Sequence, residues 1–241
     1  MSNDFAERNR QTFNQKSRTY RSEFPKVVET LISVVQGQRT WVSDVWSDTE
    51  AGKGKDIRLL EYACGPGHIS LALAPYVSRV VGMDISDGMI EEFNKNVAEA
   101  GYSDTVTGIR TDILAESSSS PAEVSGPEYF DFDVVVVSMA LHHFEHPKKA
   151  LIRLSERLKE GGVLMIVDMI PEHHQDHGLH HTSEVVNTIS KHGFSHEEMQ
   201  TMYAAAGISI GFKFQVIEEQ LEFHRDGNTF HKTIFIARGQ K

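Results

Sequence analysis

The sequence has one cysteine, few basic residues and no long hydrophobic run, and each shortage excludes a class of protein. Cys64 is alone among 241 residues, so no disulfide forms within the chain and a reducing compartment is expected. Lys and Arg number 24 against 34 Asp and Glu, and a formal charge of -10 leaves no broad basic face for nucleic acid or an anionic membrane. No apolar run approaches the roughly 20 residues of a membrane span. Residues 1–10 lack the apolar core of a secretory signal, which predicts a cytoplasmic protein.

The most informative stretch is one in which a strand, a glycine turn and a helix start follow one another. The apolar run over residues 57–60 is typical of a buried strand and is followed by the acid Glu61. Gly65 and Gly67 lie in a turn of small residues that leads into a helical pattern. Glycines let a ligand approach the backbone, and the first turn of a helix offers free N–H groups. The stretch therefore predicts a nucleotide-binding turn, although the third glycine of the phosphate-binding dinucleotide fingerprint is missing near Ser70.

Strand and helix patterns alternate after this turn. Such alternation predicts an α/β fold whose parallel sheet is covered by helices on both faces. The strands are expected over residues 57–60, 79–84, 106–111, 132–137 and 163–167, with a C-terminal pair over residues 208–223 and 230–237 joined by a turn at 226–228.

Local signals set the expected helix boundaries. Pro25 favours a helix that starts at residues 22–25, because proline is tolerated in the first turn. Ser195 and Glu198 form a capping box before a helix near the C-terminus. Helices are also expected over residues 41–46 and 147–158, the second of them stopped by Gly161-Gly162.

Glu61, Ala63, Gly65 and Gly67 form an acid-x-Ala-x-Gly-x-Gly pattern. This pattern resembles the first motif of the class I methyltransferases that use S-adenosylmethionine (SAM) as methyl donor. The wider resemblance, to small-molecule methyltransferases of the ubiquinone-biosynthesis type and to natural-product O-methyltransferases, covers about residues 13–207. It implies a Rossmann-like fold: a seven-stranded, mostly parallel sheet with one antiparallel strand, a C-terminal antiparallel hairpin and an N-terminal helical lid. The most specific further segments are residues 82–86, 138–144 and 158–162.

The expected SAM site lies beyond the carboxyl ends of the strands, where ligands bind in an open α/β sheet. Glu61 is expected to accept from the ammonium group of SAM, directly or through water. Asp84 ends the second strand, and its two oxygens are expected to accept both ribose hydroxyls. The alternative role for Asp84 is to cap the next helix. Ile85 and Met89 are expected to sandwich the adenine ring.

Asp112 ends the third expected strand. Its carboxylate is expected to accept from the adenine amino group while the backbone of Ile113 contacts the ring. The alternative is an ordinary surface acid that faces water. The turn residues Ala63, Gly65 and Gly67, together with Tyr20 and Ser138, complete the expected cofactor site.

His142 and Asp168 follow the fourth and fifth expected strands, so both belong to the ligand-binding edge. In some O-methyltransferases of the resembling group, a histidine and an aspartate at these places act near the acceptor. The resemblance thus implies that His142 takes a proton from a hydroxyl and that Asp168 orients the imidazole or binds the acceptor. A neutral imidazole can take a proton near pH 7. The alternative is that His142 and His143 only line the cleft.

The function implied by the resemblance is SAM-dependent methylation of a small organic acceptor, with oxygen as the leading acceptor atom. Methylation at carbon, nitrogen or sulfur of a quinone-like or other small metabolite is the main alternative. A SAM-binding partner subunit without catalysis is a further one. Nucleic-acid N-methyltransferases carry an Asn/Asp-Pro-Pro-aromatic motif after the fourth strand, and residues 138–141 do not match it.

No metal site is expected. Histidines are concentrated between His173 and His181, but their spacing matches no zinc signature. Catechol-type methyltransferases need a carboxylate after the fourth strand, and Ser138 stands there instead. The histidine-rich segment is therefore interpreted as a loop over the substrate pocket.

The N-terminal residues 1–50 are expected to form a helical cap on a core made of residues 51–241. Polar residues 47–55 provide the link between the two. The resemblance implies a mobile lid that contains Phe13 and Tyr20, and plain packing of the two rings is the alternative.

Overall fold

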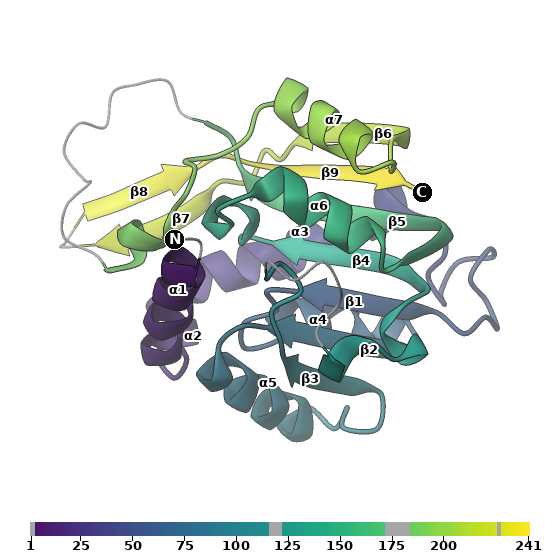
Figure 1. The fold of residues 1–241 in the computed structure, drawn as a ribbon, viewed down its shortest axis with the longest axis horizontal. Coiled ribbons are helices and arrows are strands. Elements are labelled where there is room, and N and C mark those ends of the chain that lie inside the picture. The colour runs from purple at the N-terminus through teal and green to yellow at the C-terminus, as the bar shows by residue number, and fades with distance from the viewer. Residues whose placement is uncertain (1–2, 116–121, 172–183, 226–227) are drawn as a thin grey trace.

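The computed structural model describes residues 3–115, 122–171, 184–225 and 228–241, and these build one large sheet (Figure 1). Seven strands follow the order β3-β2-β1-β4-β5-β9-β6, and β9 is antiparallel to both of its neighbours. This arrangement confirms the predicted mostly parallel sheet. The strands of this sheet are β1 Arg58–Tyr62, β2 Arg79–Asp84, β3 Val106–Arg110, β4 Phe132–Ser138, β5 Leu158–Met169, β6 Ile210–Val216 and β9 Ile234–Gln240.

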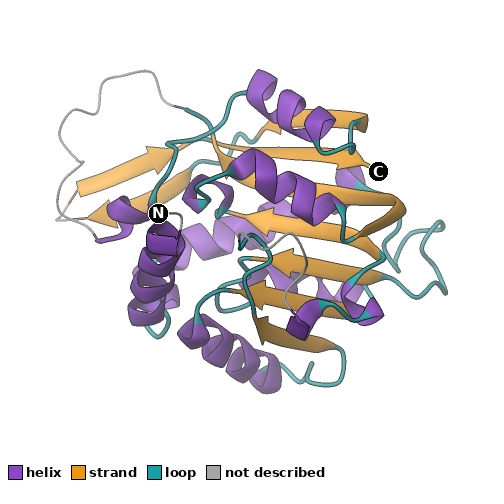
Figure 2. Cartoon of the chain, viewed as in Figure 1, coloured by secondary structure: helices purple, strands orange, loops and turns teal. Residues whose placement is uncertain are grey.

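Helices cover both faces of the sheet (Figure 2). The valines of β4 divide between two cores, since Val134 and Val136 pack with α3, α4 and α5 while Val135 and Val137 pack with α6 and α7. A strand buried on both faces reads as a continuous apolar run, which is why β4 could be predicted so clearly. The helices are α1 Asn3–Lys16, α2 Tyr20–Glu23, α3 Pro25–Val42, α4 His68–Leu73, α5 Asp87–Glu99, α6 Pro147–Ser155 and α7 His196–Ala205, with short 3-10 turns η1 Ala74–Tyr76, η2 Ala122–Val124, η3 Pro127–Tyr129, η4 Leu141–His143 and η5 Glu184–Thr188.

Two helix starts are confirmed and one expected helix is wrong. Proline occupies the first turn of α3, and the capping box of Ser195 and Glu198 is present at α7. The short helix expected over residues 41–46 does not form, because α3 continues to Val42 and the chain then turns. The fully buried Trp46 closes this turn by donating from its indole Nε1 to the carbonyl of Arg39 at 2.7 Å.

The glycine pair at residues 161–162 was expected to stop a helix, and this expectation is wrong. Helix α6 ends earlier, at Ser155, and both glycines lie inside β5. Gly161 has a φ of 80°, a conformation that suits glycine. A Cβ on Gly162 would lie 2.7 Å from the carbonyl oxygen of Phe132, so glycine lets β5 pass close to β4.

The C-terminal region contains four strands where two were expected. Strands β6 and β9 pair at one edge of the large sheet. Between them, β7 Leu221–Arg225 and β8 Asn228–Lys232 form a separate antiparallel hairpin that projects beyond the sheet (Figure 1). The predicted C-terminal hairpin is thus present, but its strands are shorter and do not belong to the main sheet; residues 226–227 of the expected turn lie outside the described residues. No helix within the described ranges is long and apolar enough to cross a membrane.

Phe93 of α5 sets the distance between this helix and the sheet. Its buried ring lies against three glycines, and a Cβ on Gly67, Gly82 or Gly108 would approach it to 2.7, 2.4 and 2.5 Å respectively. Two of these glycines belong to β2 and β3, and Gly67 belongs to the turn after β1. The ring therefore holds the start of α5 next to the glycine turn.

Candidate active site

A cavity of about 210 Å³ opens at the carboxyl ends of the parallel strands. Ala63 and Met139, which follow the adjacent strands β1 and β4, both line it and both adopt left-handed backbone angles, with φ of 56° and 51°. Such a conformation costs a non-glycine residue about 1–3 kcal/mol and is concentrated at functional sites. The Met139 N–H donates to the carbonyl of Val167 at 2.8 Å, which fixes the turn. Strained backbone at two neighbouring strand ends marks this edge as a ligand site.

Most residues predicted for the cofactor lie together in this cavity. Gly67 and Ile113 do not line it: Gly67, with a φ of 84°, shapes the turn at the start of α4, and the Ile113 side chain is buried in the core. The predicted residues that line the cavity are Tyr20, Glu61, Ala63, Gly65, Asp84, Ile85, Met89, Asp112 and Ser138.

Asp84 joins the glycine turn to the start of α5. One carboxylate oxygen accepts from the Gly65 N–H at 2.9 Å and the other from the Ser86 N–H at 2.8 Å. Burial raises the pKa of Asp84 to about 6, and these backbone donors oppose the rise. The cap of α5 is Ser86, whose Oγ accepts from the Met89 N–H at 3.1 Å. Asp84 is therefore not the helix cap, and each of its oxygens retains room for a further donor.

Glu61 is a buried acid at the end of β1, with 2% of its surface exposed. One oxygen accepts from the Ser70 hydroxyl at 2.6 Å. Burial raises the pKa of Glu61 to about 8, with the charge of Asp84 adding to the effect and the bond from Ser70 opposing it. An uncompensated carboxylate is unfavourable in such a place, so the site favours a cation that would restore the charge of Glu61.

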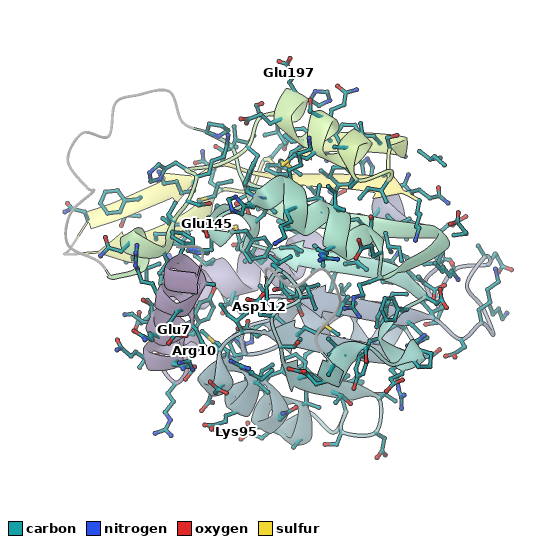
Figure 3. All side chains as sticks on the ribbon, viewed as in Figure 1. Glu7, Arg10, Lys95, Asp112, Glu145 and Glu197 are labelled. Carbon is teal, nitrogen blue, oxygen red and sulfur yellow. The ribbon has the colours of Figure 1, made fainter. Side chains whose placement is uncertain are left out.

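Asp112 lies by the strand ends that face α1 (Figure 3). Its Oδ1 accepts from the Leu114 N–H at 2.9 Å and from the Tyr62 hydroxyl at 3.3 Å. Lys149 holds the same loop by donating to the carbonyl of Leu114 at 3.0 Å. Asp112 is half-buried and lines the cavity, which contradicts the alternative of a plain surface acid.

His142 and Asp168 form the pair that the sequence suggested. The His142 Nδ1 lies 2.8 Å from Asp168 Oδ1, and both side chains are buried. Asp168 also accepts from the backbone N–H groups of His142, at 3.2 Å, and Met169, at 2.7 Å. His142 itself is not among the described residues that line the cavity. Two later histidines, His143 and His146, do line it, and the ring centroid of His143 is 4.1 Å from that of His142.

The bonding of His143 fixes its tautomer. Its Nδ1 lies 3.0 Å from both the carbonyl and the hydroxyl oxygen of Thr188, and that hydroxyl donates its hydrogen to the carbonyl of Val185 at 2.5 Å. Since both Thr188 oxygens are left as acceptors, Nδ1 carries the hydrogen and Nε2 is a free acceptor. Burial lowers the pKa of His143 well below its usual value, so this ring is neutral.

Three buried polar atoms on cavity-lining residues have no hydrogen-bond partner within the described chain: Asn9 Oδ1, His68 Nε2 and Ser138 Oγ. Each unpaired group costs about 1–3 kcal/mol, so together they indicate a polar ligand. Burial lowers the pKa of His68 to about 4, which keeps this ring uncharged. SAM carries an ammonium group, ribose hydroxyls and a flat base. The acids, the unpaired polar atoms and the glycine turn fit such a molecule.

Helix α1 forms part of the cavity and is held against the start of α5. Its Asn14 side-chain oxygen accepts from the Ser86 hydroxyl at 2.6 Å and from the Gly88 N–H at 3.0 Å. Near the same end, Arg10 pairs with Glu7 and with Asp87 of α5 (Figure 3). Phe5, Ala6, Asn9 and Phe13 of this helix line the cavity. Neither Asn9 nor Asn14 could be predicted from the sequence, because an asparagine in a polar helix gives no pattern.

No cluster of three or more His, Cys, Asp or Glu side chains suited to a metal ion occurs in the described part of the chain. The segment His173–His181, interpreted as a loop over the substrate, lies outside the described residues. That interpretation stays a prediction.

The fold and the cavity together define a class I SAM-binding protein, and comparison with known proteins agrees. Residues 38–210 match a methyltransferase domain family. An uncharacterised methyltransferase of Schizosaccharomyces pombe is 27% identical over 239 residues, covering 95% of this chain and 81% of that protein. A demethylmenaquinone methyltransferase of Clavibacter sepedonicus is 32% identical over 111 residues, covering 46% of this chain and 40% of that protein.

Solved structures share the fold at low sequence identity. A SAM-dependent methyltransferase of Thermotoga maritima has a TM-score of 0.63 at 16% identity, covering 96% of this chain and 99% of that one. Magnesium protoporphyrin IX methyltransferase of Synechocystis, with bound S-adenosylhomocysteine (SAH), has a TM-score of 0.59 at 15% identity, covering 92% and 87%. The chain belongs to the methyltransferase domain family and is a SAM-dependent methyltransferase of small molecules.

Proposed function

We propose that this enzyme transfers the methyl group of SAM to an oxygen atom of a small organic acceptor and that His142 takes the acceptor's proton. The observation that carries the proposal is the buried 2.8 Å contact between His142 and Asp168 beside the cavity. When bound, SAM supplies a methyl group on positively charged sulfur. A hydroxyl oxygen becomes a strong nucleophile only as its proton is removed, whereas a neutral amine attacks through its lone pair without prior loss of a proton. A paired base is therefore of most use to an oxygen acceptor.

Asp168 is suited to orient His142 and not to contact the acceptor. Its carboxylate is fully buried and already accepts from the His142 ring and from two backbone N–H groups. In this proposal, Nε2, the ring nitrogen of His142 that does not face Asp168, is the proton acceptor. The negative charge of Asp168 also stabilises the imidazolium that forms, as in other His-Asp pairs.

His143 lines the cavity but is less suited to hold a proton. Its pKa is lowered well below the usual value by burial and by the neighbouring His142, and its Nδ1 donates to Thr188 and not to an acid. A neutral ring with a free Nε2 can accept a hydrogen bond from the acceptor and position it. Positioning is a large part of the catalysis, because alignment alone reaches effective molarities of ~10⁵ M or more.

The test uses SAM labelled with ¹³C in its methyl group, together with a metabolite extract, and reads the chemical shift of the transferred methyl. An O-methyl signal is expected. A C-methyl signal would favour the second candidate, a quinone-like carbon acceptor, which is suggested by similarity to the demethylmenaquinone methyltransferase. Absence of any labelled product would favour a subunit that binds SAM without turning it over.

Three variants separate the roles of the two histidines. His142→Ala should lower kcat by about 10²–10⁴-fold with little change in SAM affinity. Asp168→Asn should lower kcat less than His142→Ala does if Asp168 only orients the ring. His143→Ala should chiefly raise the KM of the acceptor. The reverse pattern would move the base to His143, and near-normal turnover of His142→Ala would leave positioning alone as the mechanism.

A further inference from the structure

We infer that Asn9 determines acceptor specificity: its side-chain oxygen accepts a hydrogen bond from the acceptor, which is a flat, apolar molecule that carries a hydroxyl or N–H group and no anionic group. The inference rests on the proposed function, because it assigns the second ligand of the same cavity. It concerns the contact that selects the acceptor and not the group that takes its proton.

The orientation of the Asn9 amide is fixed by its surroundings. Asn9 is 4% exposed and lines the cavity. One end of its amide lies 3.0 Å from the carbonyl oxygen of Phe5, and a carbonyl can only accept. That end is therefore the NH₂ group. The other end is the oxygen Oδ1, which has no hydrogen-bond partner within the described chain. The cavity thus presents a buried acceptor that requires a donor from a ligand.

Asn9 lies on the part of α1 that approaches His143. Phe13, one turn later on the same helix face, packs edge-on against His143 with ring centroids 5.1 Å apart. On the other side, Arg8 donates to the carbonyl of Asn187 at 3.3 Å, next to the Thr188 that holds His143. The contacts of α1 with residues 86–88, which follow β2, are made by the later residues Arg10 and Asn14. Asn9 is therefore placed toward the acceptor end of the cavity.

The side chains that line the cavity near Asn9 select the part of the acceptor that does not contact Asn9. Aromatic and small apolar side chains surround this end of the cavity, and flat molecules bind well between such rings. Lys149 is the one Lys or Arg side chain among the described lining residues, and its ammonium already donates to the carbonyl of Leu114. A carboxylate or phosphate on the acceptor would lack a counter-charge. The neighbouring residues are Phe5, Ala6, Phe13, His143 and Phe144.

A ligand without the donor would leave the Asn9 oxygen unpaired, as it is now. Sites built to hydrogen-bond a ligand group reject the analogue that lacks it far more strongly than apolar pockets reject a missing methylene. For one neutral hydrogen bond, a preference of about 10- to 100-fold for the donor-bearing ligand is expected. The hydroxyl that Asn9 binds need not be the one that is methylated.

The test measures binding and needs no turnover. The full chain is saturated with SAH, and the affinities of 2-naphthol and naphthalene are compared by ligand-observed NMR. The wild type should bind 2-naphthol about 10-fold or more tightly than naphthalene. Asn9→Leu, which keeps the size but removes the oxygen, should abolish this preference. Gln11→Leu changes an exposed residue of the same helix and should retain it.

Equal binding of the two probes by the wild type would overturn the inference, as would an unchanged preference in Asn9→Leu. A loss of SAH affinity in Asn9→Leu with the preference intact would assign Asn9 to the cofactor instead. If the leucine variant does not fold, Asn9→Ala, which also lacks a side-chain oxygen, replaces it in the same comparison. Methyl transfer is measured separately with labelled SAM, so failure of the proposed reaction is distinguishable from failure of the Asn9 assignment.

Discussion

Replacing Glu61 with glutamine should remove a pH dependence of SAM binding that the burial of this acid creates. The pKa of Glu61 in the free protein is raised to about 8, so the acid is protonated at neutral pH. Contact with the ammonium group of SAM favours the carboxylate. Binding therefore releases a proton from Glu61, and affinity should fall as the pH drops below about 8.

The size of the effect follows from the pKa. Each pH unit below about 8 reduces the carboxylate fraction of Glu61 about tenfold, so that at about pH 6 only ~1 in 100 of the molecules carries the carboxylate. The amino group of SAM itself titrates near 8, so only about half of it is charged there. The net loss of affinity from about pH 8 to pH 6 is then roughly 10- to 50-fold, with a maximum near pH 8. Asp84, with a pKa of about 6, contributes only at the acidic end of this range.

Isothermal calorimetry in buffers of different ionisation enthalpy measures both the affinity and the number of protons released. Glu61→Gln should bind SAM with no loss of affinity from about pH 8 to 7 and without release of a proton, and only the smaller contribution of Asp84 should remain near pH 6. SAH, which keeps the ammonium group but lacks the charged sulfur, serves as a matched ligand and should show the same dependence. A wild-type affinity that is flat over this range would refute the reasoning, as would an unchanged slope in Glu61→Gln.

Four further outcomes are expected. Folding raises the pKa of Glu61, so the stability of the ligand-free protein should fall as pH rises from about 4.5 to about 8, and thermal melts of Glu61→Gln should lack this fall. Asp84→Ala should weaken SAM binding by about 1–3 kcal/mol in calorimetry, because charge-assisted bonds to hydroxyls are lost. Binding of SAM should slow hydrogen exchange over residues 13–20, whereas equal exchange would indicate ordinary packed structure. Turnover should continue in the presence of a chelator. Loss of turnover with the chelator and its restoration by a divalent ion would contradict this prediction.

The packing of Phe93 gives a prediction about stability alone. Gly82→Ala places a Cβ 2.4 Å from this ring, so the ring or the helix must move. Overpacking of this kind costs about 1–3 kcal/mol. Denaturant unfolding measures it, and a variant as stable as the wild type would show that α5 is free to shift.

The sequence predicts the parts of the fold that local patterns determine. Four valines in succession predict β4 because both faces of this strand are buried. The capping box at Ser195 predicts α7 because its two hydrogen bonds are local. The glycine pair at residues 161–162 gives a wrong helix end, because glycine also permits close contact between strands. The insertion of β9 between β5 and β6 depends on tertiary packing that no local pattern records.

The candidate site likewise contains residues that local motifs predict and residues that only the tertiary structure reveals. Residues of the cofactor turn could be predicted because each strand end carries its own short motif. The structure also brings His142 and Asp168 into contact, as their places on neighbouring strands suggested. The sequence does not decide which of His142 and His143 lines the cavity, because the choice depends on how η4 turns after β4. The role of Asn9 can be inferred only from the structure, in which its side-chain oxygen is buried without a hydrogen-bond partner in the described chain.

The contacts of α1 bear on how fast ligands can exchange. This helix borders the cavity, and its Asn14 also accepts from Ser86 and Gly88 at the first turn of α5. If α1 acts as the expected lid, its displacement on product release breaks these bonds and exposes the beginning of α5 to water. In that case the residence time of a ligand depends on the stability of the turn that follows Asp84. Substitutions at Asn14 would act on the rate of release before they act on any chemical step.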